Sequence, residues 1–282
     1  MKNSDKTVTG IIGYPLGHTL SPAMHNAVYE KYKMNWEYRV FETPPKDVWK
    51  IIKKMKKEKF AALNVTVPHK QAVMKYLDRI DRAAKTIGAV NTVIPVKGRL
   101  TGFNTDYLGF ERTLKKNRIS IKNKKVVMLG AGGAAHAIAY AIKLRTPSEF
   151  HIFNIDIPMT RGLVKKLKIK DTKIWMLKKN PVLDEIMVSA DFIVNCTSVG
   201  MDNRSNPYKI DRLKKKGIPV YDIIYNPAKT PFLKQAEKKG AKIINGLDML
   251  IYQGMEGFKL WTGKAGDYAL VKKTAEKFLK KK

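Results

Sequence analysis

The sequence contains a single cysteine, Cys196, among 282 residues. One cysteine excludes an intramolecular disulfide and any metal site built on a cysteine cluster, and we predict no bound metal. Because Cys196 follows the apolar residues Ile193 and Val194, we expect a small buried side chain at the end of a strand. No apolar stretch approaches the roughly 20 residues of a membrane span, and no apolar signal core follows the first six residues. We therefore expect a cytoplasmic protein without a membrane partner.

Acidic residues are also scarce, because 24 Asp and Glu stand against 55 Lys and Arg, for a formal net charge of +31. The lysines are spread along the chain, and the segment 50–57 alternates apolar and basic residues at helical spacing. That pattern is typical of the solvent face of an amphipathic helix. No zinc-finger spacing or aromatic RNA-binding strand accompanies the charge. We therefore expect no specific nucleic-acid partner, although the positive field favours encounters with small anions.

The first hundred residues alternate between strand and helix patterns. Apolar runs or period-two alternation predict strands, and amphipathic spacing predicts helices. Ser21 is the expected N-cap of the first helix, with Pro22 in its first position. The predicted strands are 8–13, 36–40, 60–65, 90–96 and 100–103, and the predicted helices are 22–33, 46–57 and 68–77.

The second half contains a glycine loop in a specific context. Residues 125–129 read as a buried strand, the G-x-G-x-x-A pattern of Gly130 to Ala135 follows, and an apolar run to Leu144 reads as a helix. A strand, a glycine turn and a helix in this order predict a dinucleotide site. Further strands are predicted at 149–154, 172–176, 191–196, 219–224 and 241–244, a rhythm that favours a parallel sheet covered on both faces.

These patterns predict a two-domain α/β protein. Residues 106–246 form a Rossmann-like, doubly wound domain that binds the nicotinamide nucleotide. Residues 1–105 form an α/β domain for the substrate and the catalytic groups. The two last helices, near 247–262 and 267–281, return to this first domain, so that 247–282 belong to it.

Two charged residues begin predicted helices in the first domain. Lys70 falls in the first turn after the strand 60–65, where a cation opposes the helix dipole, and Asp106 stands at the next helix start. Taken alone, Lys70 is one surface lysine among many and Asp106 is an ordinary helix cap. Taken together, an amine and a carboxylate near a nicotinamide suit the reduction of a carbonyl, with the amine delivering the proton.

The loop Gly13 to Pro22 carries two hydroxyls two residues apart, Thr19 and Ser21, just before a helix. Such a pair can hold a carboxylate. The alternative is that both residues only shape the loop and the helix start. We expect His18, in the same loop, to be structural.

Several motifs together resemble the shikimate dehydrogenase family. In the first half these are G-Y-P-x-x-H-T-x-S-P-x-x-H-N from Gly13, N-V-T-V-P-H-K from Asn64, G-A-V-N-T from Gly88 and G-x-N-T-D from Gly102. The second half adds the glycine loop, N-x-T-x-x-G-M from Asn195, the segments 221–227 and 230–232, and N-G-x-x-M-L-x-x-Q ending at Gln253. The resemblance covers nearly the whole chain.

The resemblance implies reversible, nicotinamide-dependent reduction of 3-dehydroshikimate to shikimate, a small-molecule step in aromatic amino-acid biosynthesis. It implies that Lys70 and Asp106 form the catalytic pair. The implied substrate residues are Thr19, Ser21, Asn64, Thr66, Asn91, Tyr225 and Gln253. The implied cofactor residues are Gly130, Ala131, Gly132, Gly133, Ala134, Ala135, Asn154, Asp156, Thr197, Ser198, Val199, Ile223, Gly246 and Met249. Without the family, Met249 would be read as a core residue.

Two positions depart from the family pattern. The family often has serine where this chain has Thr19, whose hydroxyl keeps the carboxylate contact while its methyl alters the space around the ring. Members that use NADP typically show Asn-Arg-Thr after the second cofactor-domain strand, whereas this chain has Asn154-Ile155-Asp156. An acid there usually binds an unphosphorylated ribose and repels a 2′-phosphate. We therefore expect the protein to use NAD, or both NAD and NADP, although NADP is typical of the family. If NADP binds, Arg161, Lys165 or Lys166 would replace the missing arginine as the ligand of its 2′-phosphate.

Three alternatives remain open at this point. A quinate/shikimate dehydrogenase with NAD preference is compatible with Thr19 and Asp156. Another two-domain dehydrogenase with a catalytic lysine, acting on folates, would not need the hydroxyls of Thr19 and Ser21. A basic nucleic-acid-binding protein on a dehydrogenase fold is the third, because fold does not fix function. We expect a monomer or a homodimer.

Overall fold

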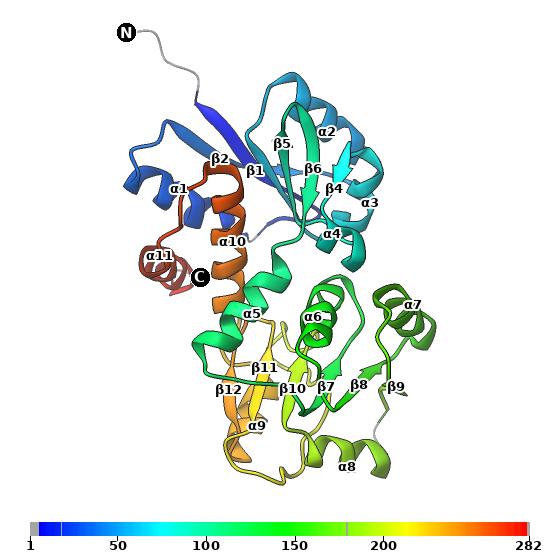
Figure 1. The fold of residues 1–282 in the computed structure, drawn as a ribbon. Coiled ribbons are helices and arrows are strands. Elements are labelled where there is room, and N and C mark those ends of the chain that lie inside the picture. Colours follow the sequence, from blue (N-terminus) through cyan, green and yellow to red (C-terminus); the bar gives the residue numbers. More distant parts are fainter. Residues whose placement is uncertain (1–5, 18, 179, 281–282) are drawn as a thin grey trace. The chain divides into compact units, whose positions relative to one another are not determined.

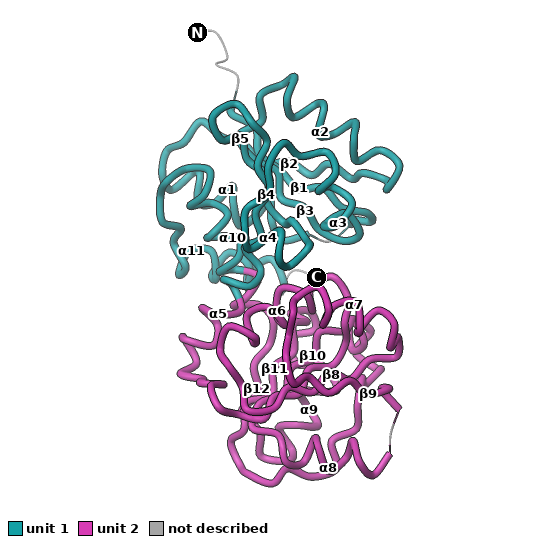
Figure 2. Tube along the Cα trace, turned by 45° about the vertical axis from the view of Figure 1, so that its right-hand side comes forward, with its two compact units in different colours: residues 1–109, 251–282 teal, residues 110–250 magenta. Residues whose placement is uncertain are grey.

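The computed structural model describes residues 6–17, 19–178 and 180–280. The chain divides into two compact units (Figure 2). Unit 1 comprises Met1–Gly109 and Ile251–Lys282, and unit 2 comprises Phe110–Leu250. His18 lies outside the described residues.

Unit 1 is built on a six-stranded sheet in the order β2-β1-β3-β5-β6-β4 (Figure 1). β1 is parallel to β2 and β3, whereas β5 is antiparallel to both β3 and β6. The start of β5 therefore lies beside the ends of β3 and β6, and the loops at these three points meet at one edge of the sheet. The strands are β1 (Thr7–Gly13), β2 (Trp36–Glu42), β3 (Ala62–Val65), β4 (Arg79–Ile80), β5 (Thr92–Val96) and β6 (Arg99–Phe103).

Apolar spacing accounts for helix α2 of unit 1. α2 buries Val48, Ile51, Ile52 and Met55 along one stripe, and this stripe packs on Leu63 and its neighbours to form the core of the unit. The α-helices are α1 (Ser21–Lys31), α2 (Val48–Lys57), α3 (His69–Ala72), α4 (Arg82–Ile87), α5 (Asp106–Lys116), α10 (Leu247–Thr262) and α11 (Tyr268–Lys280), with 3-10 turns at Pro45–Asp47 and Val73–Tyr76. α5 and α10 each continue across a boundary between the units.

Two local predictions for unit 1 were wrong, and two short elements were missed. Ser21 is the first residue of α1 rather than its N-cap, which is Leu20 and makes no side-chain capping bond. The helix expected over 68–77 is the single turn α3 followed by a 3-10 turn. β4 and α4 were not expected, because two and six residues are too short for a periodic signal.

Unit 2 contains a six-stranded sheet in which every pairing is parallel. β7 is central, β8 and β9 extend to one side, and β10, β11 and β12 extend to the other, which is the strand order of dinucleotide-binding folds. The strands are β7 (Lys125–Leu129), β8 (Glu149–Asn154), β9 (Thr172–Met176), β10 (Phe192–Asn195), β11 (Pro219–Asp222) and β12 (Lys242–Ile244), and the helices are α6 (Gly133–Leu144), α7 (Ile157–Leu167), α8 (Pro181–Ser189) and α9 (Pro231–Lys238). The predicted two-domain α/β fold with a Rossmann-like sheet is confirmed.

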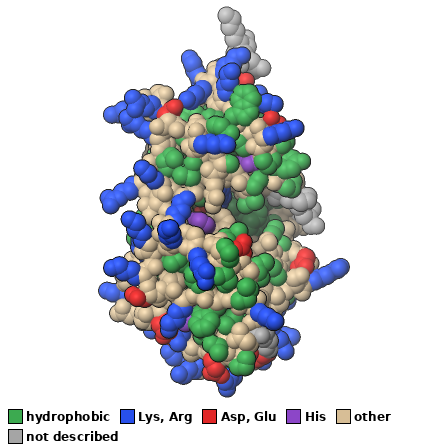
Figure 3. Space-filling view, turned by 90° about the vertical axis from the view of Figure 1, so that its right-hand side faces the viewer, with side chains coloured by type: hydrophobic (Ala, Val, Ile, Leu, Met, Phe, Trp, Pro, Cys, Tyr) green, Lys and Arg blue, Asp and Glu red, His purple; other side chains and the backbone are tan. Residues whose placement is uncertain are grey.

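The surface agrees with the dispersed charge of the sequence. Lys and Arg side chains are scattered over the visible face of each unit rather than gathered in one patch (Figure 3). Among the described residues, no helix is both long and apolar enough to span a membrane. The same residues contain no group of three or more His, Cys, Asp or Glu side chains arranged to hold a metal ion.

Candidate active site

Lys70 and Asp106 form an ion pair in unit 1. The Nζ atom of Lys70 lies 2.7 Å from Oδ2 of Asp106. The lysine side chain is 14% exposed and the aspartate side chain 9%. Lys70 comes from α3, just after β3, and Asp106 begins α5, just after β6, so the strand pairing described above brings the two loops together. Such a pair holds an amine at a fixed point, where it can exchange a proton with a ligand oxygen.

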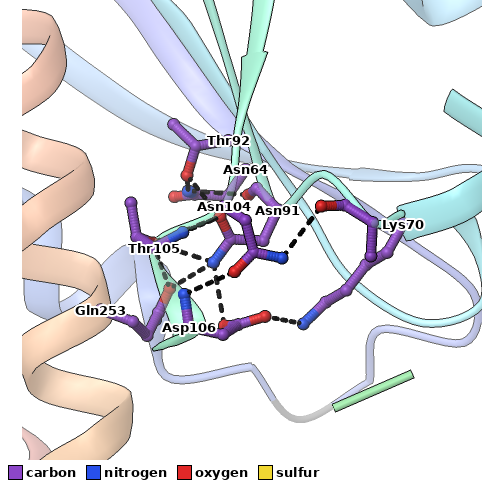
Figure 4. A network of polar contacts seen from close by, with 9 residues as sticks. Asn64, Lys70, Asn91, Thr92, Asn104, Thr105, Asp106 and Gln253 are labelled. Atoms are coloured by element: carbon purple, nitrogen blue, oxygen red, sulfur yellow. Dashed lines mark hydrogen bonds and ion pairs between the residues drawn. The ribbon is translucent and has the colours of Figure 1, made fainter. Parts of the chain in front are cut away.

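Asn91 connects this pair to the rest of the network (Figure 4). Its Nδ2 atom donates to Oδ1 of Asp106 at 2.9 Å and to Oε1 of Gln253, on α10, at 3.3 Å. Its Oδ1 atom accepts from the backbone N–H of Thr105 at 2.8 Å. The two oxygens of Asp106 therefore have different donors, Asn91 on one and Lys70 on the other. Motifs separated by up to 162 residues in sequence meet here.

Asn104 and Thr105 belong to the network although we had not predicted them. Asn104 accepts from the backbone N–H of Asp106 at 3.0 Å and donates to the carbonyl of Ala89 at 2.9 Å. Thr105 Oγ1 lies 2.9 Å from Nδ2 of Asn91. Both residues are buried, and both are part of the G-x-N-T-D motif. The motif could have identified them, because an amide and a hydroxyl preceding a helix start commonly fix that start.

Asn64 has its amide group almost fully engaged. Tyr38 donates its hydroxyl to Oδ1 of Asn64 at 2.7 Å. Nδ2 of Asn64 donates to Oγ1 of Thr92 at 3.0 Å and to the carbonyl of Asn91 at 3.3 Å. One lone pair of Oδ1 is left for a further donor. Tyr38 lies within the predicted strand 36–40, and nothing in the sequence indicates its bond to Asn64.

The Thr19–Ser21 turn also contacts Tyr38. Thr19 Oγ1 accepts from the backbone N–H of Ser21 at 3.3 Å, which fixes the turn. Burial raises the pKa of Tyr38 well above its ordinary value, nearby Tyr29 adds to this, and a hydrogen bond with Ser21 opposes it. Thr66 is half-buried at the end of β3, and its methyl lies 2.5 Å from the position of a Cβ added to Gly13.

The glycine loop in unit 2 joins the end of β7 to the start of α6. Gly130 has φ +94°, and an added Cβ would lie 2.8 Å from Cγ2 of Thr197, so this position requires glycine. Gly132 and Gly133 have open space where a Cβ would stand. Space above the loop and the first backbone N–H groups of α6, a helix of 12 residues, fit a pyrophosphate. Ala131 and Ala135 are buried, and Ala134 is partly exposed.

The loop after β10 carries three of the predicted cofactor residues. Asn195 holds Thr197 in place. Oδ1 of Asn195 accepts from the backbone N–H of Thr197 at 3.0 Å and from the hydroxyl of Thr197 at 2.7 Å. Ser198 and Val199 are exposed. This loop therefore presents polar and apolar groups to solvent from a fixed base.

Two further predicted residues make a very close backbone approach. A Cβ on Gly246 would lie 1.9 Å from the carbonyl oxygen of Ile223, so no larger residue fits.

Met249 is buried, with 7% of its surface exposed. This burial is compatible with a cofactor residue and equally with an ordinary core residue. Tyr225 lies in unit 2, half-buried, and burial raises its pKa.

The segment after β8 differs from a phosphate clamp. Ile155 is 73% exposed. Asp156 caps α7, because its Oδ1 accepts from the backbone N–H of Met159 at 2.8 Å. Asn154 is buried and donates to the carbonyl of Asp156 and to Oγ1 of Thr160. The acid is therefore fixed at the mouth of this helix.

Comparisons with known families match both ends of the chain. A family described as the shikimate dehydrogenase substrate binding domain matches residues 11–93, and one described as the shikimate 5′-dehydrogenase C-terminal domain matches residues 246–276. A shikimate dehydrogenase (NADP(+)) of Dehalococcoides mccartyi is 42% identical over 98% of this chain and 97% of its own.

Solved structures are similar over nearly the whole chain. Shikimate 5-dehydrogenase from Listeria monocytogenes, in complex with shikimate and NAD, gives a TM-score of 0.88 at 32% identity, covering 95% of this chain and 96% of its own. The enzyme from Thermus thermophilus, in complex with NADP(H) and shikimate, gives 0.86 at 33% identity, covering 96% and 99%. Similar folds thus occur with either nucleotide.

Proposed function

Because the chain belongs to the shikimate dehydrogenase family, we propose that it catalyses the reversible reduction of 3-dehydroshikimate to shikimate with a nicotinamide nucleotide. The observation that supports this most directly is the ion pair of Lys70 and Asp106, at 2.7 Å, inside a network that also contains Asn91 and Gln253. The amine and the carboxylate are largely shielded from solvent, so the ion pair fixes the position of the amine, and in this proposal a ring oxygen binds beside it.

Lys70 is the proton donor in the direction of reduction. The substrate carbonyl carbon receives a hydride, the electrons of the carbonyl bond move to its oxygen, and the Nζ ammonium of Lys70 supplies the proton that completes the hydroxyl. In the direction of oxidation, the neutral amine takes the proton back. Asp106 holds the amine in place through Oδ2, and Asn91 holds the carboxylate through Oδ1.

The substrate carboxylate is bound by Thr19 and Ser21, and the ring hydroxyls by Asn64, Thr66, Asn91 and Gln253. Both amide hydrogens of Asn64 are already committed, so a ring hydroxyl must donate to its Oδ1. Asn64 therefore acts as a hydrogen-bond acceptor toward the substrate and not as a donor. A compound lacking that hydroxyl leaves Oδ1 partly unpaired and binds less well.

The glycine loop of unit 2 binds the dinucleotide pyrophosphate. Gly132 and Gly133 leave the space that the phosphates require, and the start of α6 supplies backbone N–H groups. When bound, the nicotinamide supplies the hydride. Thr197, Ser198, Val199, Ile223, Gly246 and Met249 line the nucleotide in this proposal.

We propose that the chain accepts NAD, alone or beside NADP. The support lies in Ile155, which replaces the clamping arginine, and in Asp156, whose carboxylate disfavours a 2′-phosphate. Arg161, Lys165 and Lys166 are exposed basic residues of α7 that favour NADP instead. The curated relative named above carries NADP(+) in its name, so this proposal rests on the chain's own departures.

One assay tests the function. Purified protein is mixed with shikimate and either NAD or NADP, and formation of the reduced nucleotide is followed by absorbance. Shikimate-dependent reduction of at least one nucleotide is expected. Quinate serves as the comparison substrate, and higher kcat/KM for quinate than for shikimate would replace the proposed substrate. No reaction with either acid would contradict the proposal.

A further inference from the structure

Asp222 is a buried carboxylate that the proposed reaction does not use. It is the last residue of β11 and has no exposed surface. Its Oδ1 atom accepts from Nδ2 of Asn195 at 3.1 Å and from the backbone N–H of Ile224 at 3.1 Å. Its Oδ2 atom accepts from Oγ1 of Thr230 at 2.7 Å. The end of β10, the loop after β11 and the start of α9 therefore meet on one side chain.

All three partners are donors, which matches an ionised carboxylate. Thr230 Oγ1 itself accepts from the backbone N–H of Leu233 at 3.3 Å, so its own hydrogen is free to point at Asp222. Burial raises the pKa of Asp222, and the hydrogen bonds from Thr230, Ile224 and Asn195 oppose that rise. Burial disfavours the charged form of the carboxylate, so an ionised Asp222 requires hydrogen-bond donors that are fixed in place.

The carboxylate sets the orientation of Asn195. Nδ2 of Asn195 donates to Asp222 at 3.1 Å and to the carbonyl of Val199 at the longer distance of 3.4 Å. Its Oδ1 therefore points the other way, and it accepts there from both the backbone N–H and the hydroxyl of Thr197. The methyl group of Thr197 in turn packs against Gly130, with 2.8 Å between Cγ2 and the position of an added Cβ. A chain of direct contacts runs from Asp222 through Asn195 and Thr197 to the glycine loop.

We propose that Asp222 is a positioning residue for nucleotide binding, which fixes Asn195 and through it holds Thr197 against the first glycine of the loop. This role of Asp222 rests on one part of the proposed function, namely that the glycine loop binds the nucleotide. Asp222 does not touch the nucleotide in this proposal. Its effect is on affinity for the nucleotide, and not on affinity for shikimate, whose proposed ligands other than Tyr225 lie in unit 1.

Asp222→Ala and Asp222→Asn separate this role from simple packing. In Asp222→Asn, the amide oxygen still accepts from Asn195 and Ile224, and the amide nitrogen donates to Thr230 Oγ1. Asp222→Ala removes both acceptor oxygens, and with them the hydrogen bonds from Asn195, Ile224 and Thr230. Asp191→Ala is the matched control, because Asp191 precedes β10 at the other end of the strand and also accepts a backbone N–H, from Lys125 at 3.0 Å.

The readouts are the dissociation constants of NAD and NADP by titration calorimetry, the KM for shikimate and the unfolding temperature. Asp222→Ala should weaken binding of the better nucleotide by about tenfold or more, since small displacements at a site have effects of this order or larger. The KM for shikimate should rise by less than the dissociation constant of the nucleotide, because the residues proposed to bind its carboxylate and ring hydroxyls lie in unit 1. Asp222→Asn should recover most of the affinity, and Asp191→Ala should lower the unfolding temperature without changing the affinity.

Unchanged nucleotide affinity in Asp222→Ala overturns the proposal, as does an equal loss in Asp191→Ala. If Asp222→Ala does not fold, Thr197→Val carries the test, because valine keeps the packed methyl and removes the hydroxyl that donates to Asn195 and accepts from the N–H of Val199. Full affinity in that variant also overturns the proposal. Wild-type protein that binds neither nucleotide contradicts the proposed function instead, so the two failures are distinguishable.

Discussion

The Nδ2 atom of Asn91 donates to Oδ1 of Asp106 at 2.9 Å, on the opposite side of the carboxylate from Lys70. Asn91 is 3% exposed, and its Oδ1 atom also receives the backbone N–H of Thr105. One amide thus fixes both the acid of the ion pair and the start of the helix that carries it.

Asn91→Ala should therefore affect stability and turnover together. It leaves the Thr105 N–H unpaired and removes one donor from Asp106, a loss of about 1–3 kcal/mol in the free energy of unfolding. It should also lower kcat, because Asp106 is then held by fewer partners. Denaturant unfolding and steady-state kinetics measure the two effects. A destabilised variant with wild-type kcat would show that Asn91 supports the fold alone.

Thr19→Val should raise the KM for shikimate and change kcat little, because valine keeps the shape and removes the hydroxyl proposed to bind the carboxylate. Thr19→Ser is the matched control, since serine retains the hydroxyl and should keep a KM near that of the wild type. The two variants are compared at saturating nucleotide. Equal KM values in both would exclude a carboxylate contact by Thr19.

Asp156→Ser tests nucleotide preference without removing the helix cap. Serine can still accept the N–H of Met159 at the start of α7, whereas the negative charge is lost. The ratio of kcat/KM for NADP to that for NAD should rise by about tenfold, or 1.4 kcal/mol, and Ile155→Arg should raise it further. Asp156→Ala, which also loses the cap, should lower the free energy of unfolding by about 0.5–2 kcal/mol. An unchanged ratio in Asp156→Ser would contradict the role of this charge.

His25 should make the stability of unit 1 depend on pH. Burial lowers its pKa to about 3, and its ring stacks on Tyr38 at 4.5 Å. The unfolded chain binds a proton near pH 6.5 and the folded chain does not, so the free energy of unfolding falls as the pH is lowered from about 6.5 toward 3. The loss from this group is about 1.4 kcal/mol per pH unit within that window.

His25→Phe removes that titration and keeps an aromatic ring against Tyr38. Urea unfolding at two pH values inside the window measures the slope in the variant and in the wild type. The wild type should lose more stability on acidification than the variant. Equal slopes would mean that His25 is protonated in the folded protein or is not buried.

Long periodic segments could be predicted from the sequence, and short ones could not. The apolar runs of the six parallel strands of unit 2 and the stripe of α2 are sufficient signals, because each buries a face along its whole length. α4 has only six residues and is defined by its ends, where Asp81 accepts from the N–H of Ala83 and Gly88 has φ +73°. Those end signals were present in the sequence but do not form a periodic pattern.

The same distinction holds at the candidate site. The motif order places Lys70 and Asp106 at helix starts, and the structure puts them 2.7 Å apart. Tyr38 could not be predicted, because its hydroxyl reaches Asn64 only through the pairing of β2, β1 and β3. The orientation of the side-chain amides of Asn64 and Asn91, with the oxygen on one side and the nitrogen on the other, also depends on partners from distant segments. No local sequence pattern specifies those partners.

The central claim is that the amine of Lys70 moves the proton, and the turnover of Lys70→Ala tests it most directly. Purified wild type, Lys70→Ala and the exposed-lysine control Lys53→Ala are compared for shikimate oxidation at saturating nucleotide, after circular dichroism has shown that all three are folded. Lys70→Ala should lose about 10²–10⁴ in kcat, the usual range for a general acid or base, and Lys53→Ala should match the wild type. A kcat for Lys70→Ala near that of the wild type would contradict the account.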